Sequence, residues 1–95
     1  MNLGREEFDK LKFLIFRKLL RHNLWEHTYV PCERLLTCVP GHQRGKAKHV
    51  MSILAKDDFL IFHKNNTCVS LNSRRIVEIQ SFKKQFEDCI KTIQP

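Results

Sequence analysis

Side chains suited to contacting an acidic polymer are concentrated in residues 41–56, GHQRGKAKHVMSILAK, which contain neither Asp nor Glu. Arg and Lys pair with phosphate groups or with guanine, and Gln and Asn form paired hydrogen bonds with adenine. A second run, FLIFHKNNTCVSL at residues 59–71, follows Asp57 and Asp58 and adds further basic and amide groups. We expect both segments to contact nucleic acid. The candidate contact residues are Gln43, Arg44, Lys46, Lys48, His49, Ser52, His63, Lys64, Asn65 and Asn66.

Each candidate also has an ordinary structural explanation. Lys46 and Lys48 are residue types that are common on any solvated helix face. Arg44 could brace the turn that precedes such a helix, and Asn65 and Asn66 could serve only to form a tight turn, because Asn tolerates positive φ angles. The prediction therefore concerns the group of residues and not any single member of it.

The placement of charge supports the same interpretation. The 95-residue chain has a formal net charge of +7, and residues 34–77 account for +6 of it, with eight basic residues and two acids. A localised basic field attracts polyanions, and nucleic acid is the usual one. A merely soluble basic surface is the alternative, because charge alone discriminates weakly.

Length and composition limit the class of protein. A chain of 95 residues with 42% apolar residues can build one small core, so we expect a single domain over residues 1–95. No run of 18 apolar residues is present, which argues against a membrane span, and residues 1–10 have acids where a signal peptide would be basic and apolar. We therefore expect a cytoplasmic protein with reduced cysteines packed as small core residues.

Metal and catalytic sites are not expected. Cys32, Cys38 and His42 have the spacing C-x5-C-x3-H, whereas zinc sites usually begin with two ligands separated by two to four residues. A redox-sensing thiol is the remaining possibility for Cys38, close to a predicted helix end. There is no glycine-rich phosphate loop, no Ser-His-Asp pattern and no pair of carboxylates within a plausible cleft, so we expect no enzyme and no cofactor.

Apolar spacing predicts the elements that hold the candidate residues. Residues 6–23 form a helix with an unusually wide apolar surface, residues 25–30 a short strand, and residues 31–39 a second helix beginning at Pro31. Residues 43–57 form a third helix whose inward side carries Ala47, Val50, Met51 and Leu54. A hairpin over residues 59–71 follows, and Asn72 or Ser73 caps a last helix over residues 73–93.

This order of elements resembles the winged-helix family over about residues 6–80. The most characteristic parts are HQRGKAKHVMSILAKDDFLIF and VSLNSRRIVEI, which look like small, mostly uncharacterised archaeal winged-helix proteins. The resemblance implies an α+β winged helix, with a three-helix helix-turn-helix core, a two-stranded wing and an additional C-terminal helix. Asp58 departs from the pattern, because such sequences usually have Gly just after the third helix, at a left-handed position.

Three functions are compatible with the predicted fold and the distribution of charge. The resemblance implies a transcriptional regulator that reads double-stranded DNA with the helix at residues 43–57 and the wing at residues 59–71. We expect it to act as a homodimer through its first and last helices, whose apolar surfaces exceed what a small core needs. The alternatives are a protein-interaction module without DNA binding and an RNA-binding domain; few aromatic residues are available on strand faces for stacking RNA bases.

Overall fold

The structure is a computed structural model that describes the backbone of residues 4–93 and the side chains of residues 4–88. Within these limits the fold is α+β, with four α-helices and a three-stranded antiparallel sheet in the order β1-β3-β2. The helices are α1 (Arg5–Arg21), α2 (Cys32–Leu35), α3 (Arg44–Lys56) and α4 (Ile76–Ile93), and the strands are β1 (Val30–Pro31), β2 (Leu60–His63) and β3 (Cys68–Leu71). The predicted α+β class is confirmed.

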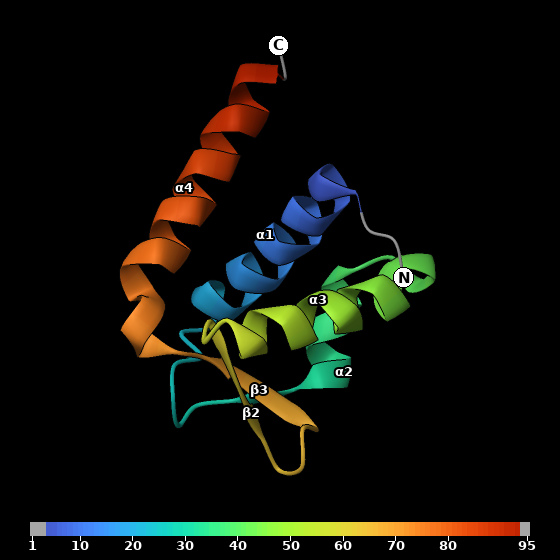
Figure 1. Cartoon of the computed structure of the whole chain (residues 1–95), viewed down its shortest axis with the longest axis vertical. Helices are drawn as coiled ribbons and strands as arrows, with labels where there is room; N and C mark the ends of the chain where they lie inside the picture. The colour runs from blue at the N-terminus through green and yellow to red at the C-terminus, as the bar shows by residue number, and fades with distance from the viewer. Residues whose placement is uncertain (1–3, 94–95) are drawn as a thin grey trace.

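Helix α1 is the centre of the domain. It packs against α3 and α4 and also contacts α2 and β3 (Figure 1). The predicted helix over residues 6–23 is confirmed, except that it begins at Arg5 and ends two residues early, at Arg21. Its wide apolar surface is used within the chain, since five of its side chains are buried. These are Leu11, Phe13, Ile15, Phe16 and Leu19.

The segment between α1 and α3 differs from the prediction. The strand expected over residues 25–30 is reduced to Val30–Pro31, because Glu26 has a φ of 53° and turns the chain away from an extended path. The Glu26 carboxylate instead accepts hydrogen bonds from the hydroxyl and the backbone N–H of Ser73, and these bonds lower its pKa. Glu26 thus ties this loop to the chain just before α4.

The second helix is also shorter than predicted. Pro31 is not its first residue but pairs with Cys68 in the sheet, and the Cys32 N–H donates to the Thr67 carbonyl at 2.8 Å. These contacts keep the chain extended up to Cys32, so α2 spans only Cys32–Leu35 and a 3-10 turn, Leu36–Cys38, follows it. The hairpin therefore gains a third strand, which begins at Val30, the last residue of the strand predicted over residues 25–30.

Helix α3 has the inward face that the sequence predicts. Ala47, Val50, Met51 and Leu54 are all buried. The helix begins at Arg44, one residue later than predicted, because a 3-10 turn over Gly41–Gln43 precedes it. The polar side of α3 consequently faces away from the core along its whole length.

A left-handed residue joins α3 to the hairpin. Asp58 has a φ of 66°, its N–H donates to the Ala55 carbonyl, and the Phe59 N–H donates to the Leu54 carbonyl. This pair of bonds is the Schellman arrangement that normally places Gly at the left-handed position. The expectation of a left-handed conformation at Asp58 is confirmed, and this residue sets the direction in which the hairpin leaves the helix.

The last helix follows a 3-10 turn, Ser73–Arg75, whose Arg74 N–H is capped by the Asn72 side chain. Ile79 is fully buried, and Phe82 and Phe86 pack against aromatic rings of α1; the ring centroids of Phe86 and Phe13 are 4.6 Å apart. Ile90 and Ile93, the last apolar residues of this helix, lie outside the described side chains. Ile76 and Val77 differ from the buried positions, with 39% and 69% of their surface exposed.

None of the helices described is long and apolar enough to cross a membrane.

Replacing Asp58 with Gly should stabilise the fold by about 0.5–1 kcal/mol, because Gly reaches a positive φ without a Cβ penalty. Urea denaturation followed by circular dichroism would measure the change. Asp57→Gly is the matched control: Asp57 has a φ of −89°, so Gly should destabilise the fold there by about the same amount. Effects of the same sign at both positions would contradict the assignment of the left-handed residue.

Candidate nucleic-acid interface

The outer face of α3 carries a line of polar side chains. Arg44, Lys48 and Ser52 follow one another at intervals of four residues, which places them along one side of the helix. All three are exposed, as is His49 beside them. Neither Arg44 nor Lys48 forms a salt bridge with any other residue described. This line therefore offers two uncompensated positive charges and two groups able to form hydrogen bonds.

Two of the candidates on this segment are not fully exposed, and one of them is paired within the chain. The Lys46 ammonium lies 2.7 Å from a carboxylate oxygen of Glu7 on α1. Gln43 is half-buried and precedes α3, with its N–H donating to the Pro40 carbonyl. This ion pair offsets the positive charge of Lys46. The pair could not be predicted from the sequence, because Glu7 is 39 residues away. Only part of the predicted cluster of cations thus stays free.

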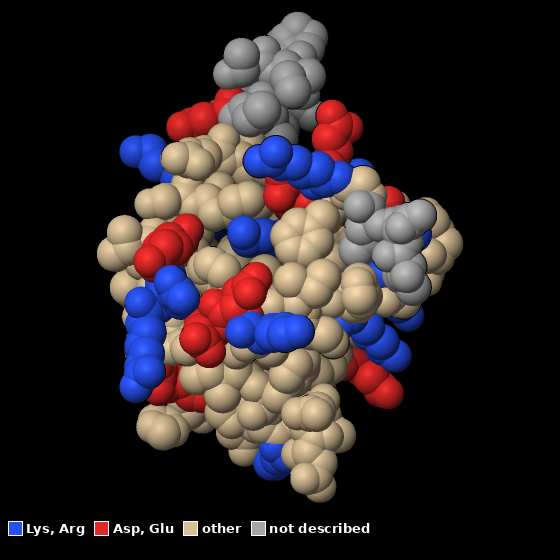
Figure 2. Space-filling model, in the orientation of Figure 1, with Lys and Arg blue, Asp and Glu red and all other residues tan. Residues whose placement is uncertain are grey.

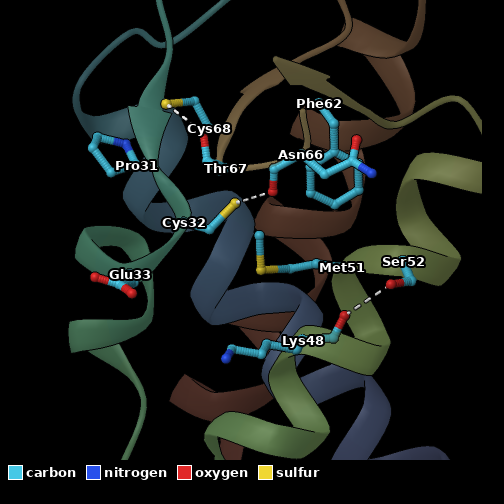
Figure 3. A pocket seen from close by; sticks show the side chains of 10 residues that line it. All are labelled: Pro31, Cys32, Glu33, Lys48, Met51, Ser52, Phe62, Asn66, Thr67 and Cys68. Atoms are coloured by element: carbon cyan, nitrogen blue, oxygen red, sulfur yellow. Dashed lines mark hydrogen bonds between the residues drawn. The ribbon is translucent and has the colours of Figure 1, made fainter. Parts of the chain in front are cut away.

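A groove brings α3 and the hairpin together. Its volume is about 660 Å³, and it lies between the start of α2, the outer side of α3 and the end of the hairpin (Figure 3). Lys48, Ser52 and Asn66 border it, so three candidates from two separate segments share one surface. The Ser52 hydroxyl also donates to the Lys48 carbonyl at 3.2 Å, which fixes its position on this border.

The hairpin turn consists of three consecutive residues with positive φ. The φ values of Lys64, Asn65 and Asn66 are 48°, 56° and 67°. The Thr67 N–H and hydroxyl both donate to the Lys64 carbonyl and close the turn. The two Asn residues fit this geometry as their type predicts, whereas Lys64 adopts it without that advantage. Their side chains are exposed at the tip of the hairpin.

His63 is held against the outer side of the sheet. Its ring stacks on Tyr29, with centroids 4.5 Å apart, and its Nε2 atom lies 2.8 Å from the Ser70 hydroxyl. The single hydroxyl proton of Ser70 is donated to the Glu26 carbonyl, so the hydroxyl oxygen accepts a hydrogen bond from the His63 ring. Nε2 is therefore the protonated ring nitrogen. The Lys64 ammonium lies 5.4 Å from the centre of the Tyr29 ring.

Tyr29 is the residue of this region that sequence reasoning missed. The segment WEHTYV was interpreted as a strand, and Tyr29 instead lies in the loop before β1. Neither Tyr29 nor His63 lines the groove, whereas Phe62, the neighbour of His63 in β2, does. The candidate residues are thus divided between a groove side and an outer side.

The excess charge of residues 34–77 is divided as well. Arg74 and Arg75 lie at the start of α4, where Arg75 is 3.7 Å from Glu78 and packs over the Phe59 ring. Figure 2 shows basic and acidic side chains interspersed on the face in view, while the hairpin at the bottom is mostly uncharged. On the face in view, the basic residues therefore do not form one continuous surface.

Cys32 and Cys38 do not have the features of reactive thiols. Burial raises the pKa of Cys32, and the neighbouring Cys68 adds to this effect while Lys48 opposes it. Burial likewise raises the pKa of Cys38, against the influence of Lys18 and Arg17. A raised pKa means less thiolate at neutral pH. In the part of the chain that is described, no three His, Cys, Asp or Glu residues are grouped so that they could hold a metal ion.

No family model, curated protein or solved structure matches this chain. The function is therefore inferred from the geometry of the outer face of α3, the groove and the hairpin.

Ser70→Ala should destabilise the fold by about 1–3 kcal/mol, because it leaves the His63 N–H and the Glu26 carbonyl without their partner beside a fully buried position. Ser52→Ala is the control, since Ser52 is exposed and its change should stay within about 0.5 kcal/mol. Chemical denaturation of both variants provides the comparison. If Ser70→Ala is as mild as the control, the network is not formed.

Proposed function

We propose that the chain is a winged-helix protein that binds double-stranded DNA with the outer face of α3 and with the β2–β3 hairpin as its wing. The observation that carries the proposal is the exposed line of Arg44, Lys48 and Ser52 on α3. Lys48 and Ser52 share the border of one groove with Asn66 of the hairpin. The order of elements supports it, because α2, a turn and α3 are followed directly by a hairpin and a further helix.

In such a complex the first part of α3 would enter the major groove. Arg44 and Lys48 would contact guanine or phosphate, and Ser52 and His49 would add hydrogen bonds along the helix. Lys64, at the exposed hairpin turn, would reach the neighbouring backbone. Such contacts suit a transcriptional regulator.

RNA binding is less favoured by the aromatic residues. Proteins that bind single strands stack bases on free aromatic faces. Among the described residues, Tyr29 is the exposed large aromatic side chain, and its ring already stacks on His63. A protein-interaction module without DNA binding has its best support in Ile76 and Val77, which expose apolar surface at the start of α4.

A homodimer through the first and last helices remains part of the proposal, with α4 as its main contributor. The apolar excess of α1 is already covered, because Phe13 and Phe16 pack against Phe86 and Phe82 of α4. Among the described side chains of α4, Ile76 and Val77 expose apolar surface that is still available to a partner.

DNA affinity should fall as salt is raised. Arg44, Lys48 and Lys64 are the exposed cations of the interface without a carboxylate partner among the described residues, and about three phosphate contacts give a slope of about −3 in log K against log salt. Fluorescence anisotropy with a random duplex at several salt concentrations would measure the slope. The absence of binding at low salt would refute the proposal.

The two lysines of α3 should behave differently. Lys48→Gln should weaken binding by about tenfold near 0.1 M salt and reduce the salt slope by about 1, because it removes a direct phosphate contact. Lys46→Gln is the matched variant on the same helix, and it should leave the slope unchanged because Glu7 already holds this lysine. Equal salt slopes for Lys48→Gln and Lys46→Gln would mean that α3 does not present the face proposed here.

The double variant Arg44→Glu/Lys48→Glu should abolish binding while the circular dichroism spectrum stays native, because both side chains are exposed.

A further inference from the structure

The groove between α2, α3 and the hairpin has the dimensions of a small-molecule site. Its volume of about 660 Å³ falls within the ~300–1,000 Å³ that is usual for ligand pockets. Three separate parts of the chain form its walls: the start of α2, the outer side of α3 and the end of the hairpin (Figure 3). Nothing in the proposed DNA contacts requires an apolar hollow of this size.

The inner wall of the groove is apolar and polarisable. Met51 and Cys32 contribute sulfur atoms, and Phe62 contributes an aromatic ring from β2. The Cys32 thiol is engaged with the Asn66 carbonyl, at 3.7 Å, so it presents little polar character to the hollow. Thioethers and aromatic rings make favourable contacts with flat aromatic groups, more so than with compact polar ones.

One uncompensated cation stands at the edge of this wall. Lys48 extends from α3 toward α2, and it forms no salt bridge with a described residue (Figure 3). Its charge acts on the groove, since it opposes the rise in the pKa of Cys32 that burial causes. Glu33 borders the groove from α2. A ligand with one negative charge at Lys48 suits this border, whereas a second negative charge near Glu33 would be repelled.

We infer that this groove binds a small aromatic monoanion, with its rings against Phe62 above the floor to which Met51 contributes, and its acidic group at Lys48. A carboxylate or sulfonate on one to three aromatic rings has this chemistry. The inference goes beyond the proposed DNA binding and does not depend on it.

Two fluorescent dyes separate the apolar and ionic parts of the site. 8-Anilinonaphthalene-1-sulfonate carries the aromatic rings and one negative charge, and N-phenyl-1-naphthylamine carries the same rings without the charge. Titration of the full chain should show one site that binds the anionic dye more tightly than the neutral dye. Lys48→Gln should weaken the anionic dye about fivefold, as expected for one partly screened ion pair, and leave the neutral dye unchanged.

Lys56→Gln is the matched control, because Lys56 is an exposed lysine of α3 that does not border the groove. It should affect neither dye. Ser52→Trp should abolish binding of both dyes, since the indole fills the groove from an exposed position. Near-ultraviolet circular dichroism must show native packing in each variant, so that dye binding to a loosened core is not mistaken for the site.

The inference is overturned if the anionic dye does not bind at tens of micromolar, if Lys48→Gln and Lys56→Gln affect it equally, or if Ser52→Trp leaves it bound. These measurements need no DNA. A failure of the groove is therefore distinguishable from a failure of duplex binding.

Discussion

The burial of α1 is the constraint on which the rest of the structure depends. A chain of 95 residues can support one core, and α1 supplies five of its buried side chains while every other helix and β3 pack around it. Because α4 covers the aromatic side of α1 and α3 covers another, each of these helices has one face that is committed inward. The outward face of α3 is thus fixed by packing and not by any partner that it might meet.

That constraint also decides where charge can be placed. Lys12 on α1 is partly buried among aromatic rings, with its ammonium 4.3 Å from the centre of the Phe82 ring. Burial lowers the pKa of Lys12, against the opposing effects of Asp9 and Asp57. On α3, Lys46 is paired with Glu7, whereas Lys48 stands at the border of the groove without a salt bridge to a described residue. Similar lysines two residues apart consequently differ in what they can bind.

Features that depend on neighbouring residues could be predicted from the sequence. The inward face of α3 and the Asn72 cap follow from local spacing and residue type. The left-handed conformation of Asp58 follows from the resemblance to winged-helix sequences, which usually have Gly at this position. The ion pair between Glu7 and Lys46, and the contact of Tyr29 with His63, join residues that are more than 30 positions apart. Such contacts depend on how the elements pack, so the free and occupied members of the candidate site could not be separated beforehand.

The pairing of β1 with β3 has a mechanical consequence. Val30 and Pro31 bond to the hairpin directly before α2 begins, and Cys32 adds a further bond to Thr67, so the hairpin is braced on the side of α2. A braced hairpin cannot swing to follow the curvature of a partner. In the proposed complex any adjustment between the hairpin and the duplex would then fall mainly on the duplex, and the stiffness of each DNA sequence would contribute to its selection without any base being touched.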